Sequence, residues 1–216
     1  MKRCYFVRHG QTLWNSENRI QGHSDVPLSP LGEQQAQSVG SFFASYHLKG
    51  IFTSTLQRSQ QTAAAIVAGN GHGVSPIVER DLAEIHLGAW EGLTPEEVDA
   101  RYQGAYQQWR VQPSAVRIPQ AEPLAAFQQR VRQALARILS SIEEGEYVVV
   151  SHGGVIAAVL AETLGADFDM LLRRLRLDNG GITALEFGTR LPHVLWINAT
   201  AHLATCLHPP LGVTWF

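Results

Sequence analysis

Four side chains whose types suit the binding of an anion each stand just after a short apolar run of the chain. They are Arg8 and His9 after residues 3–7, Arg58 after residues 50–53, and His152 after residues 147–150. Arginine suits a phosphate dianion because its guanidinium stays charged and can donate two hydrogen bonds at once. An imidazole with one unprotonated ring nitrogen can attack a phosphoryl group, whose charge nearby cations stabilise. These residue types therefore predict a phosphoryl-transfer site.

Such chemistry also needs a proton donor, because a departing alkoxide must be protonated. A carboxylic acid that is buried or lies near anions has a raised pKa and can supply that proton. Glu84, which follows the apolar run 74–78, is the better placed candidate, and Glu91 is the second. Gly10, directly after His9, is expected to let the backbone approach a ligand and present its amide hydrogen. The chain has neither a P-loop nor a His-Glu-x-x-His spacing, so we expect no metal and no cofactor.

The elements that must position these residues alternate between strand and helix. Strands are predicted at 3–7, 50–53, 74–78, 147–150, 182–187 and 193–197, and helices at 33–46, 56–68, 124–142 and 155–164. The β-branched run 147–150 indicates a central parallel strand, whereas Pro76 makes the third strand an edge piece. This order predicts a three-layer α/β/α sandwich with a mostly parallel central sheet. Ligands of such sheets lie beyond the carboxyl ends of the strands, where the candidate residues stand.

We interpret residues 1–216 as a single domain in which residues 88–122 form a helical cap insertion. Four aromatic residues of this stretch are expected to pack within the cap rather than to contact substrate: Trp90, Tyr102, Tyr106 and Trp109. Pro123 then suits the first turn of the long helix, and Gly145 is expected to end it.

The composition excludes several classes of protein. Apolar residues make up 45% and charged residues 17% of the 216 positions, and the formal net charge is −2. That balance favours neither a nucleic-acid partner nor a membrane surface. No run approaches the roughly 18 apolar residues of a membrane span. The two cysteines, Cys4 and Cys206, are too few for a disulfide framework, so we expect a cytoplasmic protein, with a homodimer as the commonest default assembly.

Each candidate also has a plain structural interpretation. His9 could be a structural histidine at a strand end, Arg58 a solvated arginine at a helix start, and His152 a turn residue. The convergence of all of them after separate strands favours the site. Of the remaining histidines, His23 and His86 lie close enough to the motif segments to line a pocket. The basic run Arg173, Arg174 and Arg176 is interpreted as a solvated face or interface edge, with a second anion site as the alternative.

The segment from Arg8 to Thr12, followed by Asn15, resembles the Arg-His-Gly-(Glu/Gln)-Thr…Asn signature of the histidine phosphatase superfamily, in its phosphoglycerate-mutase-like branch. The likeness covers roughly residues 3–187 and five ordered motifs. Its further positions are Gln21-Gly22, 25–29, Gly32, 35–36, Ser54, Leu56, Arg58, 61–63, 82–84, Gly88, 90–92, 151–153 and Asn179. A lone Arg-His-Gly would be weak evidence, whereas five ordered motifs are specific.

The resemblance implies roles for these residues. His9 would be the nucleophile that becomes phosphohistidine. The side chains that hold the phosphoryl group would be Arg8, Arg58 and His152. Glu84 would be the proton donor and later the base for water. Asn15, Gln21 and Gly22 match positions near the substrate phosphate, and Gln11 and Thr12 are weaker matches.

One departure from the family pattern bears on the substrate. Many members carry Pro-x-Gly-Glu-Ser before the long helix, whereas this chain has the sequence Pro-Gln-Ala-Glu-Pro at 119–123. The acid, Glu122, is retained, but the glycine and the serine are not. This change leaves the phosphoryl pocket as expected and places any family-based choice of substrate in doubt.

The leading functional hypothesis is therefore a metal-independent phosphomonoesterase acting on a small phosphorylated metabolite. Candidates implied by the family are phosphoglycerates, phosphoserine, α-ribazole phosphate and sugar phosphates. The first alternative is a cofactor-dependent phosphoglycerate mutase, which must keep water from its intermediate and in known examples has a longer insertion and tail. A binding module without activity is the third, and it would be expected to lack the nucleophile or the acid.

Overall fold

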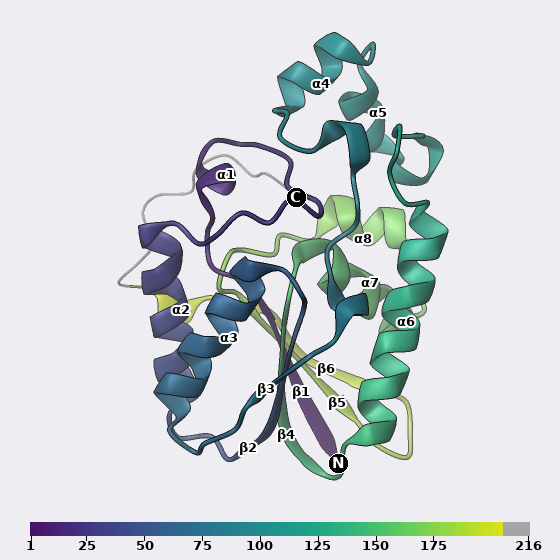
Figure 1. Ribbon diagram of the computed structural model, residues 1–216. Coiled ribbons are helices and arrows are strands. Elements are labelled where there is room, and N and C mark those ends of the chain that lie inside the picture. Colours follow the sequence, from purple (N-terminus) through teal and green to yellow (C-terminus); the bar gives the residue numbers. More distant parts are fainter. Residues whose placement is uncertain (205–216) are drawn as a thin grey trace.

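The computed structural model describes residues 1–204, so Cys206 and most of the tail from residue 200 onward lie outside the described part (Figure 1). The strands are β1 (Lys2–Arg8), β2 (Leu48–Thr53), β3 (Pro76–Val78), β4 (Gly145–Ser151), β5 (Ile182–Phe187) and β6 (His193–Ala199). The helices are α1 (Leu13–Ser16), α2 (Pro30–Phe42), α3 (Gln57–Asn70), α4 (Pro95–Arg101), α5 (Ala105–Val111), α6 (Leu124–Ser141), α7 (Gly153–Leu164) and α8 (Phe168–Arg174). Short 3-10 turns cover Arg80–Leu82, Gly88–Trp90, Pro113–Ala115 and Ala201–Leu203.

The strands form one sheet in the order β3-β2-β4-β1-β5-β6. The first four are mutually parallel, and β5 and then β6 add antiparallel pairs. The apolar strand β4 lies between β1 and β2, and β3 is an edge strand, both as predicted. The sheet is thus mostly parallel, which confirms the predicted fold class.

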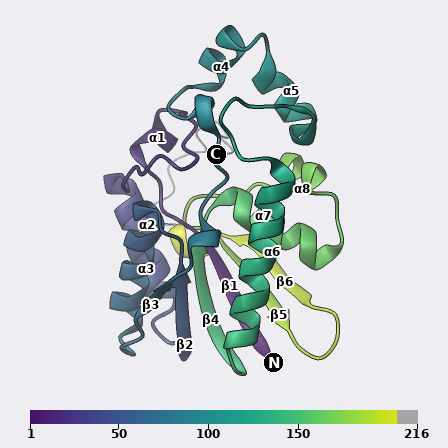
Figure 2. The same ribbon diagram turned by 45° about the vertical axis from the view of Figure 1, so that its right-hand side comes forward.

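Helices cover both faces of the sheet, with α2 and α3 on one side and α6, α7 and α8 on the other (Figure 2). Alternate side chains of β1 pack on opposite sides of the sheet, because neighbouring side chains of a strand point to opposite faces. Cys4 and Phe6 pack in the core beneath α6 and α7, whereas Tyr5 and Val7 pack in the core beneath α2 and α3. Each face of the sheet is therefore sealed by its own apolar core.

Local signals fix the ends of several helices. Ser29 caps α2 by accepting a hydrogen bond from the Gly32 amide, with Pro30 in the first turn. Gly165 ends α7 in the left-handed conformation, with φ of 61°. The expectation for α6 is wrong in detail. Pro123 is its cap residue rather than part of its first turn, and the helix ends at Ser141, ahead of Gly145.

The predicted cap stands above the carboxyl ends of the strands, where α4 and α5 project from the body (Figures 1 and 2). Its aromatic residues pack around Trp90, whose ring centroid lies 5.8 Å from that of Trp109, 6.2 Å from Tyr106 and 6.5 Å from Tyr102. Trp90 is only 1% exposed. These contacts agree with packing inside the cap.

Three remaining sequence features have simple places in the structure. Cys4 is a buried free thiol, and burial raises its pKa to about 12. The basic run near α8 lies at the surface, where Arg173 donates to the Asp169 carbonyl and Arg176 pairs with Asp178 at 2.8 Å. Within residues 1–204, no helix has both the length and the apolar character that crossing a membrane requires.

Candidate active site

The register of the parallel strands brings the candidate residues to one edge of the sheet. Arg8 of β1 pairs with Ser151 of β4, and the His9 amide donates to the Ser151 carbonyl at 3.0 Å. On the other side of β4, the Ser54 amide donates to the Val150 carbonyl at 3.3 Å. The residues that follow β1, β4 and β2 are therefore neighbours in space.

His9 is buried, and one ring nitrogen is already used. Its Nδ1 lies 2.7 Å from the Gly10 carbonyl oxygen, which can only accept, so Nδ1 carries the hydrogen and Nε2 is left unprotonated. Burial lowers the pKa of His9 well below its usual value, and the charges of Arg58 and Arg8 lower it further. The imidazole is thus held neutral, with Nε2 available as a nucleophile.

The two arginines are buried cations held in place by backbone carbonyls. Arg58 donates from Nη1 to the Ser24 carbonyl and from Nη2 to the Gly22 carbonyl, each at 2.8 Å. Burial lowers the pKa of Arg58 to about 10, which leaves it charged near neutral pH. Arg8 donates from Nη1 to the Leu177 carbonyl. Among the described residues, the Nε atoms of both arginines are buried without a hydrogen-bond partner.

His152 lies beside His9, with 5.1 Å between the ring centroids. Its Nε2 is 2.7 Å from the Ser54 hydroxyl, and its Nδ1 is buried with no partner in residues 1–204. Burial and the charge of Arg58 hold its pKa well below the usual value. If the Ser54 hydroxyl donates to Nε2, then Nδ1 carries a hydrogen that can be donated to an anion.

Glu84 brings a carboxyl group to the same cluster and is 4% exposed. Its oxygens accept hydrogen bonds from the Ile85 amide at 2.9 Å and from the Gly154 amide, two residues after His152, at 3.1 Å. Both bonds favour the ionised form, but burial is the larger effect and raises the pKa of Glu84. The group is therefore biased toward the protonated acid.

The expectation that Gly10 presents a free amide hydrogen to a ligand is wrong. The Gly10 amide donates to the Thr62 hydroxyl at 3.1 Å, so it is already paired. A Cβ atom at residue 10 would lie 2.4 Å from the Gly32 carbonyl oxygen, a distance that real Cβ contacts do not reach. Glycine is needed here because the segment after β1 packs directly against the backbone of α2, which fixes the neighbouring His9.

Hydrogen bonds connect the residues matched to substrate binding with this cluster. Asn15 accepts from the Thr12 amide at 3.0 Å and from Asn179 at 3.3 Å, and its Nδ2 is buried without a partner in the described chain. Gln21 is buried and accepts from the Thr12 hydroxyl at 2.9 Å. Gly22 contributes a carbonyl to Arg58 and has φ of 51°. Of these side chains, Asn15 retains a donor for a ligand, whereas the Thr12 hydroxyl caps α1.

Glu91, the second candidate for the acid, serves a different purpose. Its Oε1 accepts from the amides of His23 and Leu87 at 2.9 and 3.0 Å, and its Oε2 accepts from the amide and hydroxyl of Ser24. A Cβ at residue 22 would lie 2.1 Å from Glu91 Oε1. Glu91 thus ties down the loop whose carbonyls hold Arg58.

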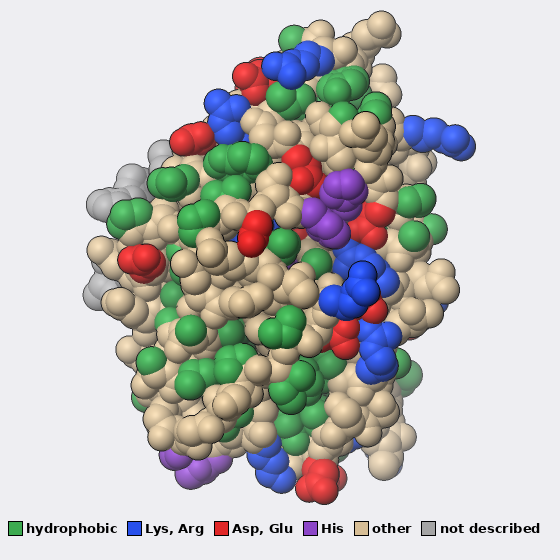
Figure 3. Space-filling model, viewed as in Figure 1, with side chains coloured by type: hydrophobic (Ala, Val, Ile, Leu, Met, Phe, Trp, Pro, Cys, Tyr) green, Lys and Arg blue, Asp and Glu red, His purple; other side chains and the backbone are tan. Residues whose placement is uncertain are grey.

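His23 and His86 lie at the outer rim rather than in the buried cluster. Their ring centroids are 5.0 Å apart, and His23 donates from Nε2 to the Glu84 carbonyl at 2.7 Å. Figure 3 shows histidine side chains at the surface of this face, bordered by acidic and basic ones. His23 and His86 therefore lie between the Glu84 loop and solvent.

Sequence reasoning assigned no role to several residues that shape the site. Ser54 contacts His152, and Asn179 donates to the His9 carbonyl at 3.1 Å. Arg130 and Glu122 hold the Glu84 loop. The one signal for Arg130 was a charged residue at the edge of the apolar face of α6, between the buried residues Phe127 and Val131.

Comparison with known proteins places the chain in a family. The profile described as "Histidine phosphatase superfamily (branch 1)" matches residues 4–200. A protein of Yersinia enterocolitica named "Probable phosphoglycerate mutase GpmB" is 35% identical over 196 residues, which cover 87% of this chain and 86% of that protein.

Two solved structures have the same fold. The Bacillus stearothermophilus protein YhfR is 30% identical, with a TM-score of 0.87 over 94% of this chain and all of that one. A mycobacterial glucosyl-3-phosphoglycerate phosphatase in complex with VO3 is 29% identical, with a TM-score of 0.82 over 92% of this chain and all of that one. The chain belongs to the histidine phosphatase superfamily.

Proposed function

We propose that this protein hydrolyses phosphate monoesters of small metabolites through a phosphohistidine at His9. One observation carries the proposal. The ring of His9, with Nε2 unprotonated, lies 5.1 Å from that of His152 and near enough to Arg58 and Arg8 for their charges to lower its pKa. Buried nitrogen atoms of Arg8, Arg58 and His152 have no partner in the described chain. Buried polar groups are normally paired, so donors left free in such a cluster fit a ligand with several acceptor oxygens.

The proposed reaction has two steps. The two arginines and His152 bind the phosphoryl oxygens, and His9 Nε2 attacks phosphorus as the bond to the ester oxygen breaks. Glu84 gives its proton to the departing alkoxide. The Glu84 carboxylate then takes a proton from a water molecule, whose oxygen attacks phosphorus and releases phosphate from His9. No step calls for a metal ion.

The remainder of the substrate would lie beside Asn15, Gln21, Gly22 and Thr12, which we propose as its binding residues. Asn15 supports this assignment best because its amide nitrogen has no partner among residues 1–204 and can donate to a ligand. A small phosphorylated metabolite remains the proposed partner. We also propose a cytoplasmic location and a homodimer.

A phosphoglycerate mutase is the second candidate, and the name of the Yersinia relative favours it. A mutase would return the phosphoryl group to a sugar acid and would need its histidine primed. The two reactions separate in one assay, in which phosphate release and isomerisation of 3-phosphoglycerate are measured with and without 2,3-bisphosphoglycerate. We expect phosphate release from simple esters without the bisphosphate, and isomerisation that required it would favour the mutase.

The pH dependence of kcat/KM follows from the two shifted groups. The lowered pKa of His9 keeps the nucleophile unprotonated to well below pH 6.5, and the raised pKa of Glu84 keeps the acid protonated above its usual range. We expect kcat/KM to fall as pH rises through the pKa of Glu84, after correction for the ionisation of the ester near pH 6. An alkaline limb that is unchanged in Glu84→Gln would contradict this assignment.

A further inference from the structure

The loop that carries Glu84 has little secondary structure of its own. It runs from β3 to the cap and contains only the 3-10 turn Arg80–Leu82. Yet the carbonyl groups of residues 81, 82, 83 and 84 all accept hydrogen bonds from side chains outside the loop. A catalytic group on a loop can be held accurately only by such surrounding contacts.

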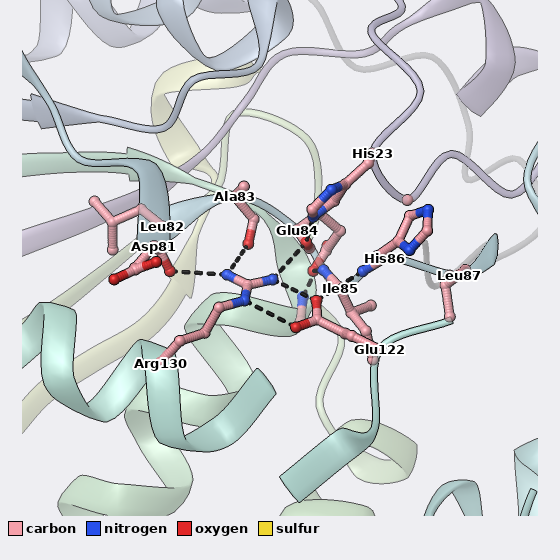
Figure 4. A network of polar contacts seen from close by, with 12 residues as sticks. His23, Asp81, Leu82, Ala83, Glu84, Ile85, His86, Leu87, Glu122 and Arg130 are labelled. Atoms are coloured by element: carbon pink, nitrogen blue, oxygen red, sulfur yellow. Dashed lines mark hydrogen bonds and ion pairs between the residues drawn. The ribbon is translucent and has the colours of Figure 1, made fainter. Parts of the chain in front are cut away.

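Arg130 of α6 supplies three of these bonds (Figure 4). Its Nη1 donates to the Asp81 carbonyl at 2.8 Å and to the Ala83 carbonyl at 2.7 Å, and its Nη2 donates to the Glu84 carbonyl at 2.7 Å. The Ser151 hydroxyl binds the Leu82 carbonyl between them at 2.7 Å. One guanidinium thus fixes the main chain on both sides of the Glu84 side chain.

Glu122 orients that guanidinium from the other side. Its two oxygens accept from Arg130 Nε at 2.9 Å and from Nη2 at 2.5 Å, so all five N–H groups of the guanidinium are used. The Glu122 carboxylate also accepts from the His86 amide at 2.8 Å, and the Glu122 amide donates to the His86 carbonyl. The side chains of Arg130 and Glu122 are each only 18% exposed. Arg130 therefore binds the main chain of residues 81, 83 and 84, and Glu122 binds that of His86.

The segment 119–123, just before α6, carries Glu122 in a tightly held turn. Gln120 adopts a left-handed conformation with φ of 62°, and the Pro119 carbonyl accepts from the Ala89 amide at 2.9 Å. Ala121 and Pro123 flank Glu122, whose side chain contacts Arg130. The contact with Arg130 gives a physical reason for an acid at position 122.

We propose that Arg130 and Glu122 are positioning residues that hold the Glu84 carboxyl in place to protonate the departing alcohol. The inference rests on the proposed function, because it assigns Glu84 the role of acid. Lysine could not replace Arg130 fully, since a single ammonium cannot reproduce the planar fork that binds three carbonyls and a carboxylate.

The test is the dependence of kcat/KM on the leaving group in Arg130→Met. This parameter covers the steps through release of the alcohol. An alkyl phosphate needs a proton donor, whereas p-nitrophenyl phosphate releases a stable anion. We expect kcat/KM to fall about tenfold to a hundredfold for the alkyl ester and by less than about threefold for the nitrophenyl ester. The alkaline limb should also move to lower pH, because a released Glu84 gains contact with water.

Arg132→Met is the matched control. Arg132 lies two residues further along α6 and pairs with Glu162 at 2.7 Å, in a pair that is largely exposed. The same substitution there removes one ion pair without touching the Glu84 loop, so the ratio of the two kcat/KM values should equal that of the wild type. Arg130→Lys and Glu122→Gln, which preserve much of the local shape, should show the same selective loss to a smaller degree.

Equal losses for both esters in the folded Arg130→Lys and Glu122→Gln variants would overturn the inference and leave the proposed function intact. Wild-type kcat/KM values for both esters in these variants would do the same. Absence of an acid-labile phosphohistidine in the wild-type protein after incubation with a labelled ester would instead remove the proposed function, and the inference with it. Thermal unfolding of each variant establishes that activity is compared below its melting temperature.

Discussion

Replacement of His9 by alanine removes turnover of every phosphate ester, with a loss of roughly 10³-fold or more in kcat. The reason is chemical, because the other groups of the cluster can bind and polarise an ester but cannot form the bond to phosphorus. The fold should persist, since within residues 1–204 the His9 side chain hydrogen-bonds only to the adjacent Gly10 carbonyl. We expect a loss of about 1 kcal/mol or less in the free energy of unfolding.

Two measurements accompany this variant. A phosphate ester labelled at phosphorus should leave an acid-labile phosphohistidine on the wild-type protein and none on His9→Ala. His47→Ala is the control, because His47 is an exposed histidine just ahead of β2, at the end of the strand away from the site. Activity of His9→Ala within tenfold of the wild type would refute the nucleophile assignment.

Glu84→Gln is expected to separate esters by their leaving groups. Glutamine keeps the shape of the side chain but has no acidic proton to give. The Ile85 and Gly154 amides donate to different oxygens of Glu84, so the single carbonyl oxygen of glutamine can take the place of one of these two acceptors. General acid catalysis contributes about 10²–10⁴-fold, so kcat/KM for an alkyl phosphate should fall by that factor, and by far less for p-nitrophenyl phosphate. Equal losses on the two esters would argue against an acid role.

The same variant has a thermodynamic signature. The pKa of Glu84 is raised in the folded protein, so its ionisation opposes folding once the pH rises above the pKa of the unfolded chain. Wild-type protein should therefore lose stability as pH rises through the folded pKa of Glu84, and Glu84→Gln should lack that loss. Denaturant unfolding at a series of pH values measures the difference. Identical pH dependence of the two proteins would show that Glu84 is not buried as an acid.

The stretches that form strands, the central place of one of them and the residues that follow them could be predicted from the sequence. Residues 147–150 are all apolar and three of them are β-branched, which suits a strand covered on both faces, and β4 lies there between two parallel neighbours. Because the carboxyl ends of parallel strands share one edge of a sheet, the positions of Arg8, His9 and His152 along the chain sufficed to predict that they would be neighbours.

Side-chain pairing across long separations could not be predicted in this way. Ser54 meets His152 across 98 positions of sequence, and Arg130 reaches the Glu84 carbonyl across 46. Every residue has a backbone carbonyl, so the sequence cannot indicate which carbonyls accept hydrogen bonds from Arg130. The role of Gly10 was missed for the same reason, since it depends on contact with the main chain of Gly32.

The sequence by itself thus determined which residue types stand at the edge of the sheet, since local apolar pattern and chain order are enough to place them. The tertiary structure alone decided which nitrogen of His9 is free, how strongly Glu84 holds its proton and what keeps its loop in place. These properties depend on burial and on charges and carbonyls from distant segments, and they exist only once the chain has folded.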